Sequence, residues 1–315
     1  MEGRGIVRVH RGEIVESEHA FAWCLSHAVV GPPVLMRSSA KPFQALAAMR
    51  AGVPERFGLD PRHVALGCAS HGGSDEHVAR VREILAAVGR DESDLECGPG
   101  EPRDPEALST FRAAGGTPEP VRHNCSGKHA FGIALAVASD WPVKGYSEAG
   151  HPLQQAMLAG VAEATELEPD VIPNATDGCG MRTFSVWLDR IAGAFGRLAG
   201  GGLGEAGTEL AAAMSAHPEL VAYSGAIDTE LMRTEPGLVS KVGAEGVLGI
   251  GLPDGRGAAL KVLDGAFRAL EPAAVLVARE ALGLAVAGPV ADGFAGAPVL
   301  SSHGDRVGSV EAELL

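Results

Sequence analysis

Residues 246–263, with the sequence GVLGIGLPDGRGAALKVL, decide the fold of this chain. Two apolar runs flank Pro253-Asp254-Gly255-Arg256-Gly257, a strong turn signal, so the stretch predicts a β-hairpin near the C-terminal end. Residues 5–24 alternate in hydropathy around Arg11-Gly12 and predict a second hairpin near the N-terminal end. Strands are therefore expected at both ends of the chain.

Helical patterns dominate between the two hairpins. We expect helices at residues 37–52, 75–88, 128–138, 152–164, 183–198, 210–216 and 266–282, and a long polar surface excursion over residues 91–120. This order predicts an α+β fold, in which N- and C-terminal strands form one antiparallel sheet covered by a helical region. We predict one catalytic unit over residues 1–315, with a sheet subregion at about 1–36 and 238–315 and a helical subregion at about 37–237.

The composition excludes several classes of protein. The chain has 315 residues and a net charge of -14, and it contains no run of Lys and Arg, so nucleic acid is not an expected partner. No stretch approaches the roughly 18 apolar residues of a membrane span, and no secretory signal is evident. Five cysteines, an odd number, make a disulfide framework improbable and favour a cytoplasmic location.

The spacing of Ser38 and Lys41 indicates a reaction class. On a helix, a spacing of three residues places a hydroxyl and an amine on one face, one turn apart. A lysine that loses its proton can activate a serine for acyl transfer. The alternative is an N-cap serine beside a surface lysine, a combination that chance supplies often.

Two further motifs support the catalytic interpretation. Ser70-His71-Gly72 follows a short apolar run, and Lys241-Val242-Gly243 stands ahead of a glycine-rich strand. The order Ser-x-x-Lys, a second serine motif and Lys-x-Gly resembles penicillin-binding proteins and serine β-lactamases. The alternative for Lys241 is a solvated strand lysine.

A third group combines two cysteines with a lysine. Cys125 and Lys128 are one helical turn apart, and Cys179 lies between two glycines. Two thiolates with His123 or His129 nearby can bind zinc, which favours sulfur and nitrogen ligands. Two buried free cysteines are an equally good explanation on composition alone.

At this point a family resemblance becomes specific. The chain resembles the Rhizobium etli-type L-asparaginases over about residues 5–270, on the motifs Arg37-Ser38-Ser39-Ala40-Lys41-Pro42, Ser70-His71-Gly72, His123-Asn124-Cys125-Ser126-Gly127-Lys128-His129, Asp177-Gly178-Cys179-Gly180 and Lys241-Val242-Gly243-Ala244-Glu245-Gly246. The resemblance implies a fold like serine β-lactamases and glutaminases, a homodimer, and hydrolysis of L-asparagine to aspartate and ammonia.

The resemblance also implies roles for single residues. Ser38 is implied as the nucleophile with Lys41 as its base, and Ser70 and Lys241 as a second Ser-Lys pair. The implied zinc ligands are Cys125, Lys128 and Cys179. Arg37, Asp177 and His129 are expected in the substrate pocket. The alternatives are a glutaminase or a penicillin-recognising serine hydrolase of the same fold, and a non-catalytic zinc-binding relative.

Overall fold

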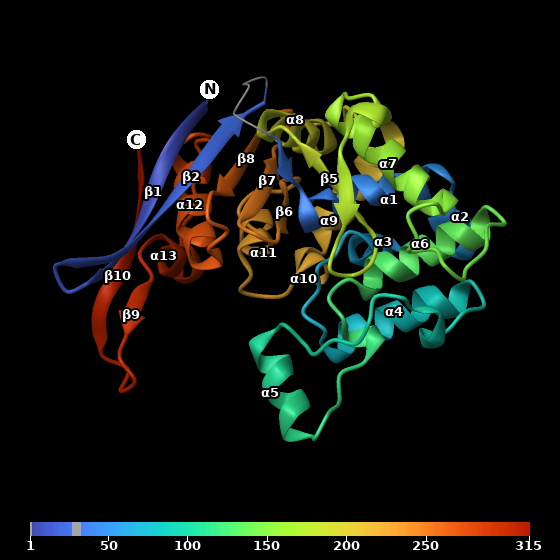
Figure 1. Cartoon of the computed structure of the whole chain (residues 1–315), viewed down its shortest axis with the longest axis horizontal. Coiled ribbons are helices and arrows are strands. Elements are labelled where there is room, and N and C mark those ends of the chain that lie inside the picture. The colour runs from blue at the N-terminus through green and yellow to red at the C-terminus, as the bar shows by residue number, and fades with distance from the viewer. Residues whose placement is uncertain (1, 27–32) are drawn as a thin grey trace. The chain divides into compact units, whose positions relative to one another are not determined.

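The N- and C-terminal strands of the chain pair in one antiparallel sheet, as the two hairpin signals predict. The structure is a computed structural model, and it describes residues 2–26 and 33–315. By its internal contacts the chain divides into unit 1 (Met1–Ser39, Ser185–Gly202 and Glu230–Leu315) and unit 2 (Ala40–Phe184 and Leu203–Thr229). Figure 1 shows the elements of both units.

The sheet of unit 1 has seven strands in the order β6-β7-β8-β2-β1-β10-β9. Its strands are β1 (Glu2–Arg11), β2 (Ile14–Leu25), β6 (Val239–Gly243), β7 (Val247–Gly251), β8 (Gly257–Val262), β9 (Pro298–Leu300) and β10 (Arg306–Leu314). The β2–β8 pairing, with Phe21 opposite Val262, joins the two predicted hairpins. An antiparallel sheet with helices is therefore confirmed.

Helices cover both faces of this sheet. The helices of unit 1 are α8 (Leu188–Ala199), α12 (Phe267–Glu280) and α13 (Pro289–Ala295). α8 packs against β7 and β8, and its Asp189 acts electrostatically on Cys24 of β2. Arg268 of α12 donates to His19, which lies on the opposite face of β2 because side chains alternate along a strand.

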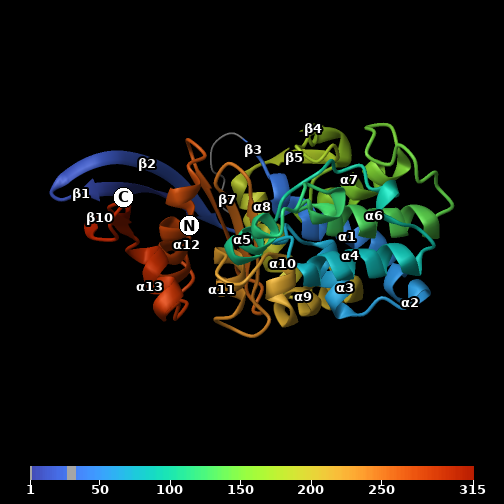
Figure 2. The same cartoon turned by 90° about the horizontal axis from the view of Figure 1, so that it is seen from below.

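Unit 2 is built around one buried helix, α6 (Ser126–Ala138), whose residues from Ser126 to Ala136 are all buried. The other helices of this unit are α1 (Lys41–Arg50), α2 (Val53–Phe57), α3 (Pro61–Gly67), α4 (Asp75–Ala87), α5 (Pro105–Ala113), α7 (Pro152–Thr165), α9 (Gly204–Ala216) and α10 (Pro218–Val221). α1, α3 and α4 pack against α6, and Figure 2 shows the helices of this unit from below. Because a helix can be buried all round only when it is apolar all round, the Ala- and Gly-rich sequence of α6 explains its place.

Three short strands and one helix complete the set of named elements. β3 (Val34–Leu35) pairs with the end of β5 (Arg182–Val186) in unit 1, and β4 (Asn174–Thr176) pairs with its beginning in unit 2. α11 (Ile227–Met232) follows α10. The helices expected at 37–52, 75–88, 128–138, 152–164, 210–216 and 266–282 correspond to α1, α4, α6, α7, α9 and α12.

Two segments differ from the predicted secondary structure. Residues 183–198 hold β5 and then α8 instead of one helix, because Phe184 and Val186 are buried in a strand that pairs on both sides. Residues 91–120, expected as a long polar surface excursion, contain α5, and the Asp104 side chain just ahead of this helix accepts hydrogen bonds from two backbone N–H groups of its first turn. Asp followed by Pro is a helix start signal that the prediction did not use.

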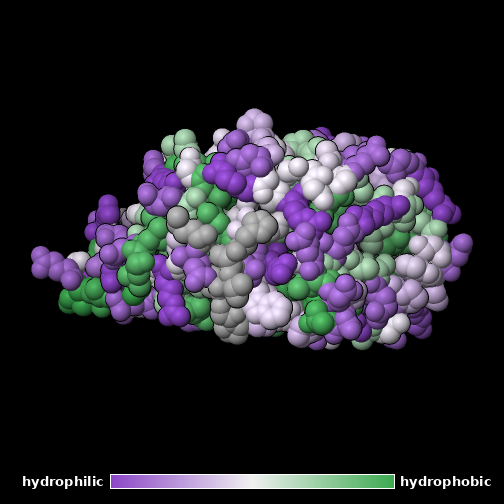
Figure 3. Space-filling view, turned by 90° about the horizontal axis from the view of Figure 1, so that it is seen from above, coloured by the Kyte–Doolittle hydropathy of each residue, from purple (hydrophilic) through white to green (hydrophobic). Residues whose placement is uncertain are grey.

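The described residues contain no helix that is both long enough and apolar enough to cross a bilayer. Figure 3 shows hydrophilic residues over one face of the molecule, with hydrophobic ones in small groups between them. Scattered apolar side chains of this kind are normal at a protein surface.

Candidate active site

Lys41 is the first residue of α1, and its side chain is buried, with 1% of its surface exposed. Its Nζ lies 2.6 Å from the carbonyl oxygen of Ala69, 2.8 Å from Ser70 Oγ and 3.2 Å from Cys125 Sγ. A surface lysine, the alternative interpretation of the Ser-x-x-Lys spacing, is therefore excluded. The amine instead joins a serine hydroxyl to a thiol.

Ser70 is held by its backbone just beyond α3. Its N–H donates to the carbonyl oxygen of Val221 at 2.9 Å, and the N–H of His71 donates to that of Asn124 at 3.1 Å. These bonds tie the serine to the end of α10 and to the loop that precedes α6. The hydroxyl is thus fixed beside Lys41, and Ser70 is partly exposed.

Ser38 and Lys241 belong to unit 1, whereas Lys41 and Ser70 belong to unit 2. Ser38 lies in a 3-10 turn, Arg37–Ala40, and Arg37 has a φ of 52°, which a non-glycine residue rarely adopts. Such strain is often found at functional sites. The boundary between the units falls inside this turn.

β6 approaches the same turn within unit 1. A Cβ atom on Gly243 would lie 2.3 Å from the carbonyl oxygen of Met36, so the contact requires glycine. Lys241 is two residues earlier on the strand and therefore has its side chain on the same face as that contact. The structure places the buried Lys241 on the side of β6 that faces the turn of Ser38.

Cys125, Lys128 and Cys179 come together in unit 2, and with Lys41 they form what we call the sulfur–lysine cluster. Cys125 precedes the first turn of α6, which contains Lys128, and Cys179 lies between β4 and β5. Lys128 Nζ donates to Cys179 Sγ at 3.2 Å. Cys125 and Cys179 also act on each other electrostatically, and all three of these side chains are buried.

The electrostatics of the cluster separate its two thiols. The neighbouring thiol of Cys125, followed by the charge of Lys128 and the imidazole of His129, holds the pKa of Cys179 far below its usual range. The proximity of Cys179, together with burial, raises the pKa of Cys125 well above its ordinary value. Burial opposes the charge of Lys128, but the neighbouring sulfurs outweigh it and raise the pKa of this lysine. These directions favour a thiolate at Cys179, a thiol at Cys125 and an ammonium group at Lys128.

The donor atoms of the cluster fit zinc. Two sulfurs and one amine nitrogen meet at a buried point, and zinc binds sulfur and nitrogen ligands in tetrahedral geometry. Over residues 2–26 and 33–315, no group of three or more His, Cys, Asp or Glu side chains is arranged to hold a metal. A zinc site here consequently needs Lys128 as its third ligand.

The structure also places the residues predicted for the substrate pocket. Asp177 is partly exposed and acts electrostatically on Lys128, while Arg37 is partly buried in unit 1. His129 is fully buried, with Nδ1 2.7 Å from the hydroxyl of Tyr146. Cys24, Cys68 and Cys97, for which the sequence suggests no role, are buried and outside any disulfide.

Two contributors to this region, Tyr146 and Glu96, were not expected from the sequence, and a third, His123, was expected only as a possible neighbour of zinc. The phenol of Tyr146 contacts His129, and the backbone of Glu96 donates to that phenol at 2.8 Å. His123 accepts a hydrogen bond from the Cys125 N–H at 3.1 Å, and burial lowers its pKa to about 4. His123 lies inside the motif around Cys125 and could have been predicted as a site residue, whereas no local sequence pattern marks Tyr146 or Glu96 as part of the site.

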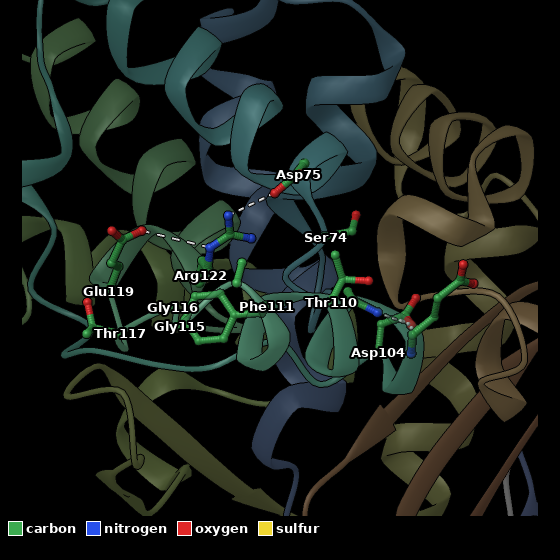
Figure 4. Close-up of a pocket in the computed structure, with 13 residues that line it drawn as sticks. Ser74, Asp75, Asp104, Thr110, Phe111, Gly115, Gly116, Thr117, Glu119 and Arg122 are labelled. Atoms are coloured by element: carbon green, nitrogen blue, oxygen red, sulfur yellow. Dashed lines mark hydrogen bonds and ion pairs between the residues drawn. The ribbon is translucent and has the colours of Figure 1, made fainter.

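A separate groove of about 600 Å³ lies on unit 2 beside α5. Figure 4 shows Arg122 at its wall, paired with Asp75 and near Glu119, over the ring of Phe111. None of the residues that line it belongs to the predicted site. The groove is thus distinct from the sulfur–lysine cluster.

Comparison with known proteins assigns the chain to a family through a family model. Among solved structures, one described as "Crystal Structure Analysis of Mglu" is 13% identical to this chain, with a TM-score of 0.35. That match covers 95% of this chain and 72% of the other chain. No curated protein matches the sequence. The family model for L-asparaginase II matches residues 7–312. The chain therefore belongs to the L-asparaginase II family.

Proposed function

We propose that this protein hydrolyses L-asparagine to L-aspartate and ammonia through a covalent acyl-enzyme. Membership of the L-asparaginase II family supports an amidohydrolase of the asparaginase type. The observation that carries the mechanism is the buried Lys41 amine, 2.8 Å from Ser70 Oγ and 3.2 Å from Cys125 Sγ. A structural lysine needs neither a serine hydroxyl nor a thiol as its partner.

The hydrogen bonds of Lys41 suit a general base. Nζ donates to the Ala69 carbonyl at 2.6 Å, to Ser70 Oγ at 2.8 Å and to Cys125 Sγ at 3.2 Å. In the proposed reaction this amine loses a proton and becomes neutral. A neutral amine within hydrogen-bonding distance of a hydroxyl can then accept the proton of a reacting serine.

In the proposed reaction, Ser38 Oγ attacks the side-chain amide carbon and its proton passes to Lys41. The C–N bond then breaks, and the leaving amine takes the proton from Lys41 to become ammonia. Water adds to the ester and releases aspartate, which restores the hydroxyl. Ser70 and Lys241 act as a second Ser-Lys pair that relays protons, and Arg37 and Asp177 bind the charged ends of the substrate.

We further propose that the sulfur–lysine cluster holds zinc through Cys125, Lys128 and Cys179. When bound, the metal supplies a positive charge near the substrate. The thiolates of Cys125 and Cys179 and the amine of Lys128 would then hold the metal's positive charge at a buried point. The serine β-lactamase-like arrangement of the two Ser-Lys pairs is part of the same proposal, and the N- and C-terminal strand pairing of unit 1 supports it.

The test is ammonia release from asparagine and from glutamine by the wild type, Ser38→Ala and Ser70→Ala. Ser38→Ala should lose all turnover, and peptide mass mapping of wild-type protein quenched during turnover should show the acyl group on the peptide that contains Ser38. Near-normal ammonia release by Ser38→Ala, with the acyl group on Ser70, would transfer the nucleophile to Ser70. If the wild type released no ammonia from asparagine or from glutamine, the protein would be a non-catalytic member of the family.

A further inference from the structure

His71 follows Ser70 in the chain, and its side chain is fully buried in unit 2. A histidine beside a serine is a candidate general base, and the surroundings of its two ring nitrogens decide whether it can act as one. Nδ1 lies 3.1 Å from the backbone nitrogen of Gly73, and Nε2 lies 2.9 Å from Oγ of Ser126. Both nitrogens therefore have a partner inside the protein.

These partners determine where the proton of the ring is. A backbone N–H can only donate, so Nδ1 of His71 accepts from Gly73 and carries no proton. Burial agrees with a neutral ring, because it lowers the pKa of His71 well below its ordinary value. The proton is then on Nε2 and is donated to Ser126, whose hydroxyl donates in turn to the Val121 carbonyl at 2.7 Å. Neither ring nitrogen is free to take the proton of a reacting serine.

The bond from His71 to Ser126 joins the same two segments that Lys41 joins. Lys41 Nζ lies 2.8 Å from Ser70 Oγ and 3.2 Å from Cys125 Sγ. His71 and Ser126 are the next residues along these two segments. The ring bond therefore helps to set the distance that Lys41 spans, and with it the distance from Lys41 to the serine hydroxyl.

A second histidine fixes the orientation of this ring. The rings of His71 and His77 stack with their centroids 5.0 Å apart and an angle of 16° between their planes. His77 is itself held at both ring nitrogens, since Nδ1 lies 2.7 Å from Ser74 Oγ and Nε2 donates to the Glu219 carbonyl at 3.1 Å. The ring of His71 is thus held by its face as well as by its edge.

The two glycines that follow His71 allow the chain to adopt this arrangement. Gly73 has a φ of 73°, a left-handed conformation that favours glycine, and from it the N–H donates back to the ring. A Cβ atom on Gly72 would lie 2.8 Å from Cβ of Asp104, so a side chain has no room there. The sequence Ser70-His71-Gly72-Gly73 therefore forms one structural unit, in which the residues after the serine hold its segment in place.

We infer that His71 is a positioning residue for Ser70: its Nε2–H, donated to Ser126, holds the serine hydroxyl beside the base, and the ring takes no proton during the reaction. The catalytic part of this inference rests on the proposed function, whereas the tautomer and the position of the hydroxyl do not. A displacement of about 1 Å can cost on the order of 100-fold in rate. Loss of the ring bond should therefore lower kcat and leave KM nearly unchanged.

Long-range ¹H–¹⁵N NMR of histidine-labelled full-length protein tests the tautomer, with the signal assigned by its absence in His71→Gln. At neutral pH the wild type should show a protonated Nε2 and a bare Nδ1 for His71. A ring protonated on Nδ1, or on both nitrogens, would overturn the inference.

Ammonia release from asparagine by His71→Leu and His71→Gln tests the positioning. Gln carries an amide N–H that can replace the Nε2–H, whereas Leu carries none. We expect kcat to fall on the order of 100-fold in His71→Leu with KM within about 2-fold, and His71→Gln to recover about 10-fold of that loss. Equal kcat values in the two variants, or a loss that lies entirely in KM, would contradict a positioning role.

His151→Leu is the matched control. His151 is also buried in unit 2, its Nδ1 accepts from the N–H of Leu153 at 3.1 Å, and its Nε2 lies 2.8 Å from the Pro142 carbonyl oxygen. The variant loses the same two kinds of hydrogen bond, so it should be destabilised to a similar degree while kcat stays unchanged. A fall in kcat equal to that of His71→Leu would reduce His71 to a structural residue.

Ser126→Ala tests the same bond if His71→Leu does not fold, because it removes the acceptor and keeps the ring. Its crystal structure should show Lys41 Nζ and Ser70 Oγ more than about 3.2 Å apart, beyond the usual length of such a hydrogen bond. An unchanged distance would overturn the inference. A wild type that releases no ammonia would refute the proposed function, and the tautomer and this distance would then decide the positioning role without it.

Discussion

Two polar networks in this molecule contain the residue types of a hydrolase, one in each unit. In unit 1, Ser17 Oγ lies 3.3 Å from His19 Nε2, and His19 Nδ1 lies 2.6 Å from Asp264, which are the contacts of a Ser-His-Asp triad. We call these residues, with Arg268, the Ser17–His19 network. In unit 2, Lys41 lies 2.8 Å from Ser70. By these distances alone, the two networks would be equally good candidates for a catalytic site.

The difference lies in the charged donor that contacts the base of the first network. Arg268 Nε donates to His19 Nε2 at 3.2 Å, and its terminal nitrogen donates to Ser17 Oγ at 2.6 Å. The histidine lone pair that would take a serine proton is therefore already used by a permanently charged group. Lys41 Nζ instead contacts the Ala69 carbonyl, the Ser70 hydroxyl and the Cys125 thiol, none of which is a permanent cation. A permanently charged donor on the base thus separates a structural contact from a candidate base.

Removing the amine of Lys41 should have the largest effect of all. We expect Lys41→Met to reduce kcat for ammonia release by roughly 10³-fold, because the base is lost while the buried aliphatic stem is kept. Steady-state ammonia release, with thermal unfolding to confirm folding, measures this effect. Lys144→Met is the matched control, because Lys144 is an exposed lysine of unit 2, and it should leave kcat unchanged. Activity of Lys41→Met within 10-fold of the wild type would remove the contrast between the two networks.

Loss of the thiolate should be the next largest effect. Cys179→Ser should weaken zinc binding by at least about 100-fold, because a serine hydroxyl does not ionise to replace the thiolate. Bound zinc after gel filtration measures this change. Cys97→Ser is the control: Cys97 is equally buried, but its pKa is raised to about 12 by burial and its Sγ donates to the Pro120 carbonyl. Equal zinc content in both variants would place the metal elsewhere.

The pH dependence of zinc binding should reveal whether Lys128 is a ligand. Cys179 has lost its proton already, whereas the raised pKa values of Cys125 and Lys128 keep both protonated at neutral pH. Ligation by both groups releases two protons, so affinity should rise on the order of 100-fold per pH unit between about pH 6 and pH 8. Calorimetry in buffers of different ionisation enthalpy counts these protons. A release of one proton would exclude Lys128 from the metal.

The sequence was most informative where the signals are local. The turn at Pro253–Gly257 and the alternation of residues 5–24 predicted the hairpins, because strand pairing across a tight turn depends on neighbours in the chain. The rare motif around Cys125 likewise predicted the residues that meet in the cluster. Tyr146 could not be predicted, because its contacts with Glu96 and His129 join positions 50 and 17 residues away.

The position of Lys241 also shows that contacts between distant parts of the chain cannot be predicted from a local motif. The Lys-x-Gly motif predicted a glycine that permits close approach, but not that the partner is the backbone of Met36. The helix expected at 183–198 failed for a related reason, since the strand residues of β5 are decided by pairing with β3 and β4. Tertiary contacts override local propensity in such segments.

The smallest effect is expected from the Ser17–His19 network. Ser17→Ala should leave asparagine hydrolysis within 2-fold of the wild type and lower the free energy of unfolding by about 1 kcal/mol, the usual net value of one hydrogen bond. Hydrolysis of a small activated ester, which needs only a nucleophile and a base, should also be unchanged, because Arg268 occupies the His19 lone pair. A loss of ester hydrolysis in Ser17→Ala that Ser38→Ala does not share would show a second working serine in unit 1. In that event the charged donor on His19 would fail as the criterion that separates the two networks, and Arg268 would have to release His19 during turnover.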